Sequence, residues 1–354
     1  MEHEILVSFD SVPLTFYNLK PTEDANTWSI ETESGILLKE GSHYVEAWTR
    51  QQVASGNVGP NIDWVALQLH QSMSRSQYLL DILQGTAAAS FELQSLSWAQ
   101  NASLAWMEKE DAISWSTLSN QELIERFVLA QLFFATSGPY WTANDGWLSS
   151  SSSRHACDWF GIICRTAGSG IKQSKLVTDL ILNGNALFGM LPSDIALLKE
   201  LVALNLDGNH MEGALFSSPN AALPPKLATL SLESNYLSGT IPFETFAAAS
   251  SSATSPLKTL SLGNNRLSGP LSEGLYQLSN LETLSLPNNA ITGTISNGIG
   301  NALVSLTTLD LRNNGLTGTI PASLGFLPLE TLQLNGNAFD GPVPATLNSW
   351  NIQV

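Results

Sequence analysis

The two cysteines are the residues of this chain with the clearest potential for chemistry. Cys157 and Cys164 stand in the segment HACDWFGIIC, residues 155–164, with six residues between them. A thioredoxin-like redox pair has two intervening residues, and a zinc site needs four ligands, whereas this segment adds only His155 to the two thiols. Both kinds of site are disfavoured, and the surroundings of the cysteines have to decide.

No convergent catalytic set is visible elsewhere. None of the histidines lies in an HExxH segment or a GxSxG nucleophile elbow, and they are scattered over His3, His43, His70, His155 and His210. The segment RTAGSGIKQSK, residues 165–175, lacks the spacing of a phosphate-binding loop. We therefore expect no enzymatic activity, no cofactor and no metal site. An enzyme would need a site in the N-terminal third that the residue pattern does not reveal.

Composition argues against nucleic acid as a partner. The 354 residues include 31 acidic and 15 basic side chains, a net charge of −16, which leaves no broad basic surface for phosphates. The N-terminus lacks a secretory signal, and the longest apolar run, at 127–135, is too short to cross a membrane. We expect contact with a membrane only through an anchor outside this sequence.

The second half of the chain is a repeat. Seven units, spaced 23 to 30 residues apart, begin at Val177, Leu201, Leu227, Leu257, Leu281, Leu306 and Leu329. The clearest is LTTLDLRNNGLTGTIPASLGFL, residues 306–327. Alternating leucines predict a short strand with one buried face. An asparagine three residues after the last leucine predicts side-chain bonds to the turn backbone, and a glycine four residues later predicts a place too tight for a side chain.

The pattern L-x-x-L-x-L-x-x-N-x-L-x-G-x-I-P resembles the plant-type leucine-rich repeat, and residues 177–350 carry it. The resemblance implies an α/β fold, a right-handed leucine-rich-repeat solenoid with a parallel concave sheet. Just before it, Ser119 and Glu122 form the sequence pattern of a helix capping box, and a short amphipathic helix is expected to follow. The tract then reaches Trp159-Phe160-Gly161-Ile162-Ile163-Cys164.

This tract resembles the N-terminal cap of plant-type leucine-rich-repeat ectodomains. The resemblance implies a disulfide between Cys157 and Cys164 and hence an oxidising compartment. We expect a small α+β module at 1–90, a helical stem at 91–118, the cap at 119–176 and seven repeats at 177–354, with a helix over residues 21–40. The stem and cap also resemble the stalk of diatom-type receptor-like proteins. Asn101 opens the sequon Asn101-Ala102-Ser103, which is either a glycosylation site or unused.

The predicted concave face offers the candidate ligand site. Its central column and the column beside it supply Asp207, Glu233, Asp310, Arg312 and Gln333. We expect a non-enzymatic recognition module, the ectodomain of an extracellular or cell-surface receptor-like protein, that binds a peptide, a glycan or a protein there. The alternative is a secreted inhibitor or adhesion protein similar to polygalacturonase-inhibiting proteins. An ordinary solvated sheet face stays open as a third interpretation.

Overall fold

The computed structural model describes residues 6–9, 12–15, 19–21, 28–30, 44–49, 65–70, 74–85, 96–113, 115–149, 155–167, 173–215, 222–248 and 254–347. Within this part the backbone divides into two units, Met1–Tyr78 and Leu79–Val354. No helix in these ranges is long and apolar enough to span a bilayer.

The described backbone of the first unit is mostly paired strands. Three antiparallel pairs are formed by β1 (Leu6–Phe9) with β2 (Val12–Thr15), β3 (Leu19–Pro21) with β4 (Trp28–Ile30), and β5 (Tyr44–Thr49) with β6 (Val65–His70). The helix expected over residues 21–40 is therefore wrong at Trp28–Ile30. The acidic residues after Pro21 resemble a helix start, but β3 provides a strand partner that the local pattern does not reveal. The boundaries expected near residues 90 and 118 stay predictions.

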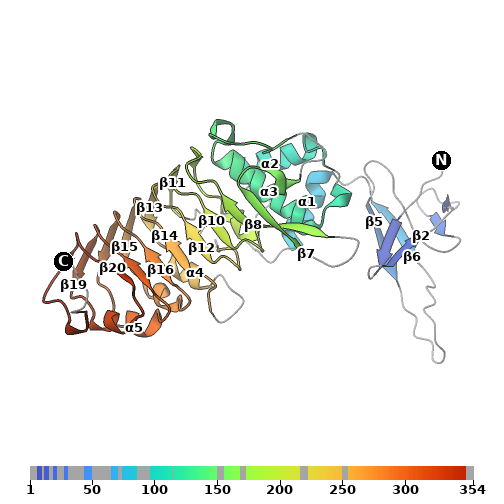
Figure 1. The fold of residues 1–354 in the computed structure, drawn as a ribbon. Coiled ribbons are helices and arrows are strands. Elements are labelled where there is room, and N and C mark those ends of the chain that lie inside the picture. The colour runs from blue at the N-terminus through green and yellow to red at the C-terminus, as the bar shows by residue number, and fades with distance from the viewer. Residues whose placement is uncertain are drawn as a thin grey trace, which may run out of the picture. The chain divides into compact units, whose positions relative to one another are not determined.

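Helices precede the solenoid in the second unit (Figure 1). They are α1 (Arg75–Gly85), α2 (Trp98–Lys109) and α3 (Asn120–Ala135), with a short 3-10 turn, η2 (Trp115–Thr117), between the last two. Ser119 is the N-cap of α3 and forms the expected capping box with Glu122. The helix is not amphipathic as expected, because all residues from Glu122 to Phe133 are buried. It packs against α2, against the turn η5 (Ser193–Leu197) and against the first strand of the repeats.

A buried charge pair fixes α3 on its neighbours. Arg126 donates to both carboxylate oxygens of Asp111, from Nε at 2.7 Å and from a terminal nitrogen at 2.6 Å. The guanidinium also lies over the rings of Trp106 and Trp159, at 5.1 Å and 5.0 Å from their centres. Because the charges are removed from water, these contacts have to compensate a large desolvation cost.

The leucine periodicity produces one continuous parallel sheet, which we call the concave sheet. Its repeat strands are β8 (Ser174–Ile181), β10 (Ala203–Asn205), β12 (Thr229–Ser231), β14 (Thr259–Ser261), β16 (Thr283–Ser285), β18 (Thr308–Asp310) and β20 (Thr331–Gln333). They pair in this order, which confirms the solenoid. In the fourth repeat Leu257, Leu260, Leu262 and Leu267 are all completely buried, so the repeats share one apolar core.

One strand of this sheet was not expected. β7 (Ile162–Ala167) pairs antiparallel with β8, and a register shift lies between Ile163 and Cys164. The strand comes from the segment that the sequence marks only as a cap loop. It covers the edge that the first repeat would otherwise expose at this end of the sheet.

The recurring asparagines form a ladder inside the solenoid. Asn265 shows the pattern: its Nδ2 donates to the carbonyls of Leu232, Leu262 and Gly263 at 2.9–3.1 Å, and its Oδ1 accepts from the amide of Leu237 at 3.0 Å. Each asparagine from 209 to 337 joins its own turn to the preceding repeat in this way. The expected role of these side chains is confirmed. In the first repeat Asn185 bonds Ala143 of the cap instead.

A second sheet, which we call the side sheet, follows the ladder. It consists of β9 (Phe188–Gly189), β11 (His210–Gly213), β13 (Tyr236–Thr240), β15 (Arg266–Pro270), β17 (Ala290–Gly293), β19 (Gly315–Gly318) and β21 (Ala338–Phe339). The recurring glycines have φ angles of 74° to 119°, which other residues rarely adopt. A Cβ at Gly189 would also overlap the carbonyl oxygen of Ala135.

Short helical turns complete the repeats on the side away from the concave sheet. Besides η5 they are α4 (Phe243–Ala248), η6 (Glu273–Gln277), α5 (Ile299–Ala302), η7 (Ala322–Phe326) and η8 (Ala345–Leu347). The long third repeat was expected to carry its extra residues, 243–256, in a loop. Phe243 and Phe246 are instead fully buried, and they anchor the first part of this insert as a helix. Residues 216–221 and 249–253 lie outside the described part.

Candidate functional site

The concave sheet places the predicted central column in register. Asn205, Ser231, Ser261, Ser285, Asp310 and Gln333 stand opposite one another in successive strand pairs. Asp207, Glu233 and Arg312 each follow their strand by two residues, so they belong to the neighbouring column of the same face. The structure therefore gathers the candidate residues on one surface.

Asp207 is held firmly by its neighbours. Its carboxylate accepts the hydroxyl of Ser231 at 2.8 Å on each oxygen, and it accepts the amide of Glu233 at 2.7 Å. These bonds span two adjacent repeats. Asp207 therefore presents a fixed negative charge rather than a mobile one.

Glu233 is the residue through which the patch is coupled. Burial raises its pKa, and the carboxylates of Asp207 and Asp310 add to that rise, whereas a hydrogen bond from Ser285 and the charge of Arg312 oppose it. The Ser285 hydroxyl donates to Glu233 Oε1 at 3.2 Å. Glu233 thus senses all three of the other charged candidates. A cation placed here would relieve the repulsion among the three carboxylates.

Arg312 and Asp310 form an ion pair of their own. A terminal nitrogen of Arg312 lies 3.0 Å from Asp310 Oδ2, and the Arg312 amide donates to Asp310 Oδ1 at 3.2 Å. Asp310 is almost buried, whereas Arg312 stays partly exposed. Gln333 is next to Asp310 in the column, and its buried Oε1 has no hydrogen-bond partner among the described residues.

An apolar part of the same face escaped the sequence reasoning. Ile163 and Ile181 lie on the adjacent strands β7 and β8 and are 50% and 38% exposed. Alternation along the strands places both on the ligand side, because their neighbours Ile162 and Leu180 are buried. Ile181 was visible in the repeat pattern. Ile163 was not, because β7 had been interpreted as a loop.

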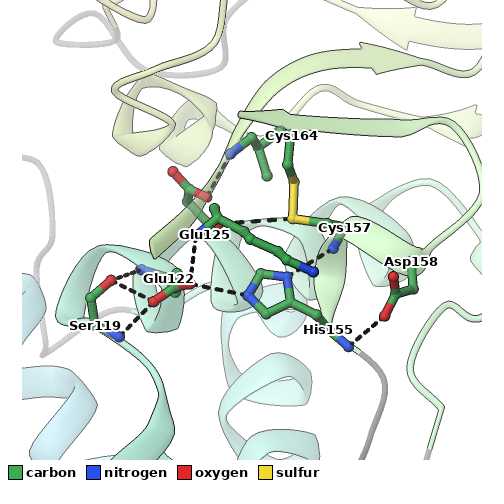
Figure 2. A network of polar contacts seen from close by, with 9 residues as sticks. Ser119, Glu122, Glu125, His155, Cys157, Asp158 and Cys164 are labelled. Carbon is green, nitrogen blue, oxygen red and sulfur yellow. Dashed lines mark hydrogen bonds and ion pairs between the residues drawn. A yellow bond between two sulfur atoms is a disulfide. The ribbon is translucent and has the colours of Figure 1, made fainter. Parts of the chain in front are cut away.

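A second cluster of ionisable groups lies where the cap meets the first repeat (Figure 2). Glu122 Oε2 accepts the amide and the hydroxyl of Ser119, both at 2.7 Å, and its Oε1 lies 3.2 Å from His155 Nε2. The same Oε1 accepts the amide of Lys175 at 2.8 Å. Burial acts to raise the pKa of Glu122, but the bonds from Ser119 and Lys175 and the nearby His155 together lower it.

Serine, histidine and glutamate are the residue types of a hydrolytic triad, but their connections differ from one. In a triad the imidazole stands between the hydroxyl and the carboxylate. Here the Ser119 hydroxyl donates to Glu122, and His155 Nδ1 accepts the amide of Cys157 at 3.1 Å. Both ring nitrogens of His155 are therefore occupied, and neither can take a proton from Ser119. The cluster fastens the cap helix to the strand β8 and to the disulfide loop.

Glu125, one helical turn after Glu122, completes this junction. It is only 1% exposed, and its Oε2 accepts the amide of Val177 at 2.9 Å. Burial raises its pKa from 4.5 to about 8, and the hydrogen bond from Val177 opposes that rise. β10 pairs with β8 only from Asp179 onward. Before that point the two glutamates of α3 take the amides of Lys175 and Val177, as a neighbouring strand would.

The remaining predicted sites can now be placed. Cys157 and Cys164 form a disulfide, as expected. Asn101 lies in the first turn of α2, where its amide donates to the carbonyls of Leu96 and Ser97 at 3.0 Å and 3.1 Å. The hydroxyl of Ser103, the third sequon residue, is completely buried. Glycosylation of Asn101 stays a prediction.

Comparisons with known proteins agree with this fold. Residues 256–278 match the family model for a leucine-rich repeat, and residues 279–323 match a model for two such repeats. Phytosulfokine receptor 1 of Arabidopsis thaliana is 37% identical over 102 residues, which are 28% of this chain and 9% of the receptor. The chain thus aligns with only a small part of that relative.

Solved structures show the same similarity. The crystal structure of PEPR1-AtPEP1 is 30% identical, with a TM-score of 0.52, over 64% of this chain and 30% of that one. A crystal structure of a pollen receptor kinase 3 is also 30% identical, with a TM-score of 0.46, over 62% of this chain and 96% of that one. The likeness extends beyond the 68 residues of the repeat models to most of the second unit.

Proposed function

We propose that this chain, a plant-type leucine-rich-repeat protein, is a recognition module that binds a peptide or protein ligand on its concave sheet. The observation that carries the proposal is the patch of Asp207, Glu233, Asp310 and Arg312. Hydrogen bonds hold two of its carboxylates, and burial has already removed part of their hydration. Such a prearranged set of charges costs less to fix on binding than mobile side chains do.

The ligand class follows from the chemistry of that face. Three carboxylates outnumber one guanidinium, so a basic group is attracted, while Ile163 and Ile181 offer an apolar area towards the cap. A peptide with a lysine or arginine and an aliphatic residue several positions away matches both features. The similarity to PEPR1, whose crystal structure is that of PEPR1-AtPEP1, supports a peptide. The disulfide supports a place outside the cell or at its surface.

Selection from a random 12-residue peptide library on the immobilised chain tests this proposal. We expect the selected peptides to be basic, and we expect Glu233→Gln and Arg312→Ala to weaken them at least tenfold, since about 1.4 kcal/mol corresponds to a factor of ten. Lys258→Ala is the matched control. It removes one partner of an exposed surface ion pair with Glu282, so affinity should change little.

Two results would contradict the concave-face model. One is a set of selected peptides that bind equally well to Glu233→Gln and Arg312→Ala. The other is loss of binding on a change of the exposed Glu244 in α4, which would move the site to the opposite side of the repeats. Folding of each variant is checked by circular dichroism, because surface substitutions should alter stability by about 0.5 kcal/mol at most.

A further inference from the structure

The outer row of the side sheet carries an aromatic stack. In each repeat the residue after the ladder asparagine begins a strand of this sheet, and from the second repeat onward these residues are His210, Tyr236, Arg266, Ala290, Gly315 and Ala338. His210 stacks on Phe188 with ring centres 4.4 Å apart, and on Tyr236 at 5.8 Å. Phe188 and Tyr236 remain 49% and 44% exposed. Large rings exposed in a continuous row are typical of an interaction surface.

Arg266 ends this stack. Its guanidinium carbon lies 4.9 Å from the centre of the Tyr236 ring. The other described basic residues of comparable position pair with acids: Lys226 with Glu200, Lys258 with Glu282 and Arg312 with Asp310. In the described ranges no carboxylate forms an ion pair with Arg266. On a chain with a net charge of −16, this leaves one exposed cation available to an external anion.

The row has space directly beyond Arg266. Neighbouring strands lie about 4.8 Å apart, so the next side chain of the row would stand roughly one ring thickness and a half further along. That position is Ala290, and the following one is Gly315; both are exposed. The side of the guanidinium that faces away from Tyr236 is therefore not covered by a side chain of the row. An additional planar group fits there as the fifth member of the stack.

We propose that this end of the row is a second binding site, which takes an aromatic side chain with an adjacent carboxylate from a peptide or protein. The ring would lie against Arg266 above Ala290, and the carboxylate would pair with the guanidinium. A guanidinium between two rings uses both of its faces for cation–π contacts, and arginine and tyrosine are the residues most often responsible for affinity at interfaces. A sugar fits less well, because the ring faces of the stack already cover one another.

This site is independent of the proposed concave site and has the opposite charge preference. The concave patch attracts a basic group, whereas Arg266 attracts an acidic one. The two surfaces also belong to different sheets. One ligand with both kinds of group, or two separate partners, could engage them without competing for the same residues.

The test uses N-acetyl-L-tryptophan, which has an indole ring and a carboxylate, followed through the backbone amide of Ala290 by ¹H–¹⁵N correlation spectra. We expect saturable shifts at Ala290 and the neighbouring strand residues. N-acetyl-L-tryptophanamide, which has no charge, should bind about fivefold more weakly, the amount that an exposed ion pair contributes at most. N-acetyl-L-leucine should cause no saturable shift.

Three variants locate the site. Arg266→Gln and Ala290→Leu should abolish binding, the first by removing the cation and the second by filling the space. Ala338→Leu is the matched control, because it makes the same change at the same repeat position two repeats further on. Equal binding of the acid and the amide, binding retained by Ala290→Leu, or equal loss in Ala338→Leu would each overturn the proposal. The remaining correlations in each spectrum show whether the variant is folded.

Discussion

Replacing Glu125 by glutamine should remove most of the pH dependence of cap stability between pH 6.5 and 8.5. The carboxyl group titrates near pH 8 in the folded chain and near 4.5 in the unfolded one. Folding therefore takes up a proton between these values, so stability is full below the lower pKa and is lost as the pH rises through the upper one. The difference corresponds to roughly 5 kcal/mol in total, at about 1.4 kcal/mol for each pH unit.

Only part of this loss falls within a convenient range. Between pH 6.5 and 8.5 the wild-type cap should lose about 2 kcal/mol from Glu125. Burial lowers the pKa of His155 below 6.5, so its contribution has the opposite sign and is already complete above the unfolded value. Glu125→Gln keeps an acceptor for the amide of Val177 but cannot ionise. The variant should show a nearly flat profile and should be more stable than wild type at pH 8.5.

Tryptophan fluorescence during urea unfolding is a suitable assay, because it reports on the cap separately. Trp106, Trp141, Trp147 and Trp159 are all buried there, and residues 173–347 contain no tryptophan. Glu122→Gln is the matched control one helical turn earlier. The pKa of Glu122 is lowered, so its stabilisation is complete above pH 4.5, and the variant should be uniformly weaker with an unchanged slope. A flat wild-type profile, or equal slopes for wild type and Glu125→Gln, would refute the reasoning.

Three further changes have expected outcomes. Replacing both Cys157 and Cys164 by serine should lower cap stability by about 2–3 kcal/mol, as estimated for a loop of this size, and added reductant should leave that double variant unaffected in the same unfolding assay. Asn265→Ala removes the donor to three carbonyls and should cost about 2–4 kcal/mol by circular dichroism, whereas the exposed Asn301→Ala should stay within about 0.5 kcal/mol. Arg126→Met should destabilise the cap by about 3–5 kcal/mol, and adding Asp111→Leu should restore much of that loss; no recovery in the double variant would contradict a penalty due to the unpaired charge.

The repeat units could be predicted in detail because their signals are local and recur. Alternating leucines give the strands, and the identical place of the asparagine in seven units predicts the ladder. The register of Asp310 beside Gln333 follows directly. The candidate patch could therefore be assembled from the sequence, although its internal bonds, such as the one from Ser231 to Asp207, could not.

The features that sequence reasoning missed depend on contacts between distant segments. Ile163 belongs to a strand only because β8 is beside it, and Trp28 belongs to one because β3 is available. The buried pair of Arg126 and Asp111 joins two helices across 15 positions. The side sheet has strands of two to five residues, too short for an alternating pattern to be recognised.

The antiparallel strand β7 has a consequence for how the chain finds its own register. β12, β14 and β16 have the same sequence, Thr-Leu-Ser, so any two of them could exchange neighbours and still form the same backbone bonds. At β8 this ambiguity ends, because its partners are a strand of opposite direction and two glutamates of α3, which occur once. The junction acts as the origin from which the repeats are counted. A chain that folded without it would be prone to entangle with a second copy through strands that cannot tell one molecule from another.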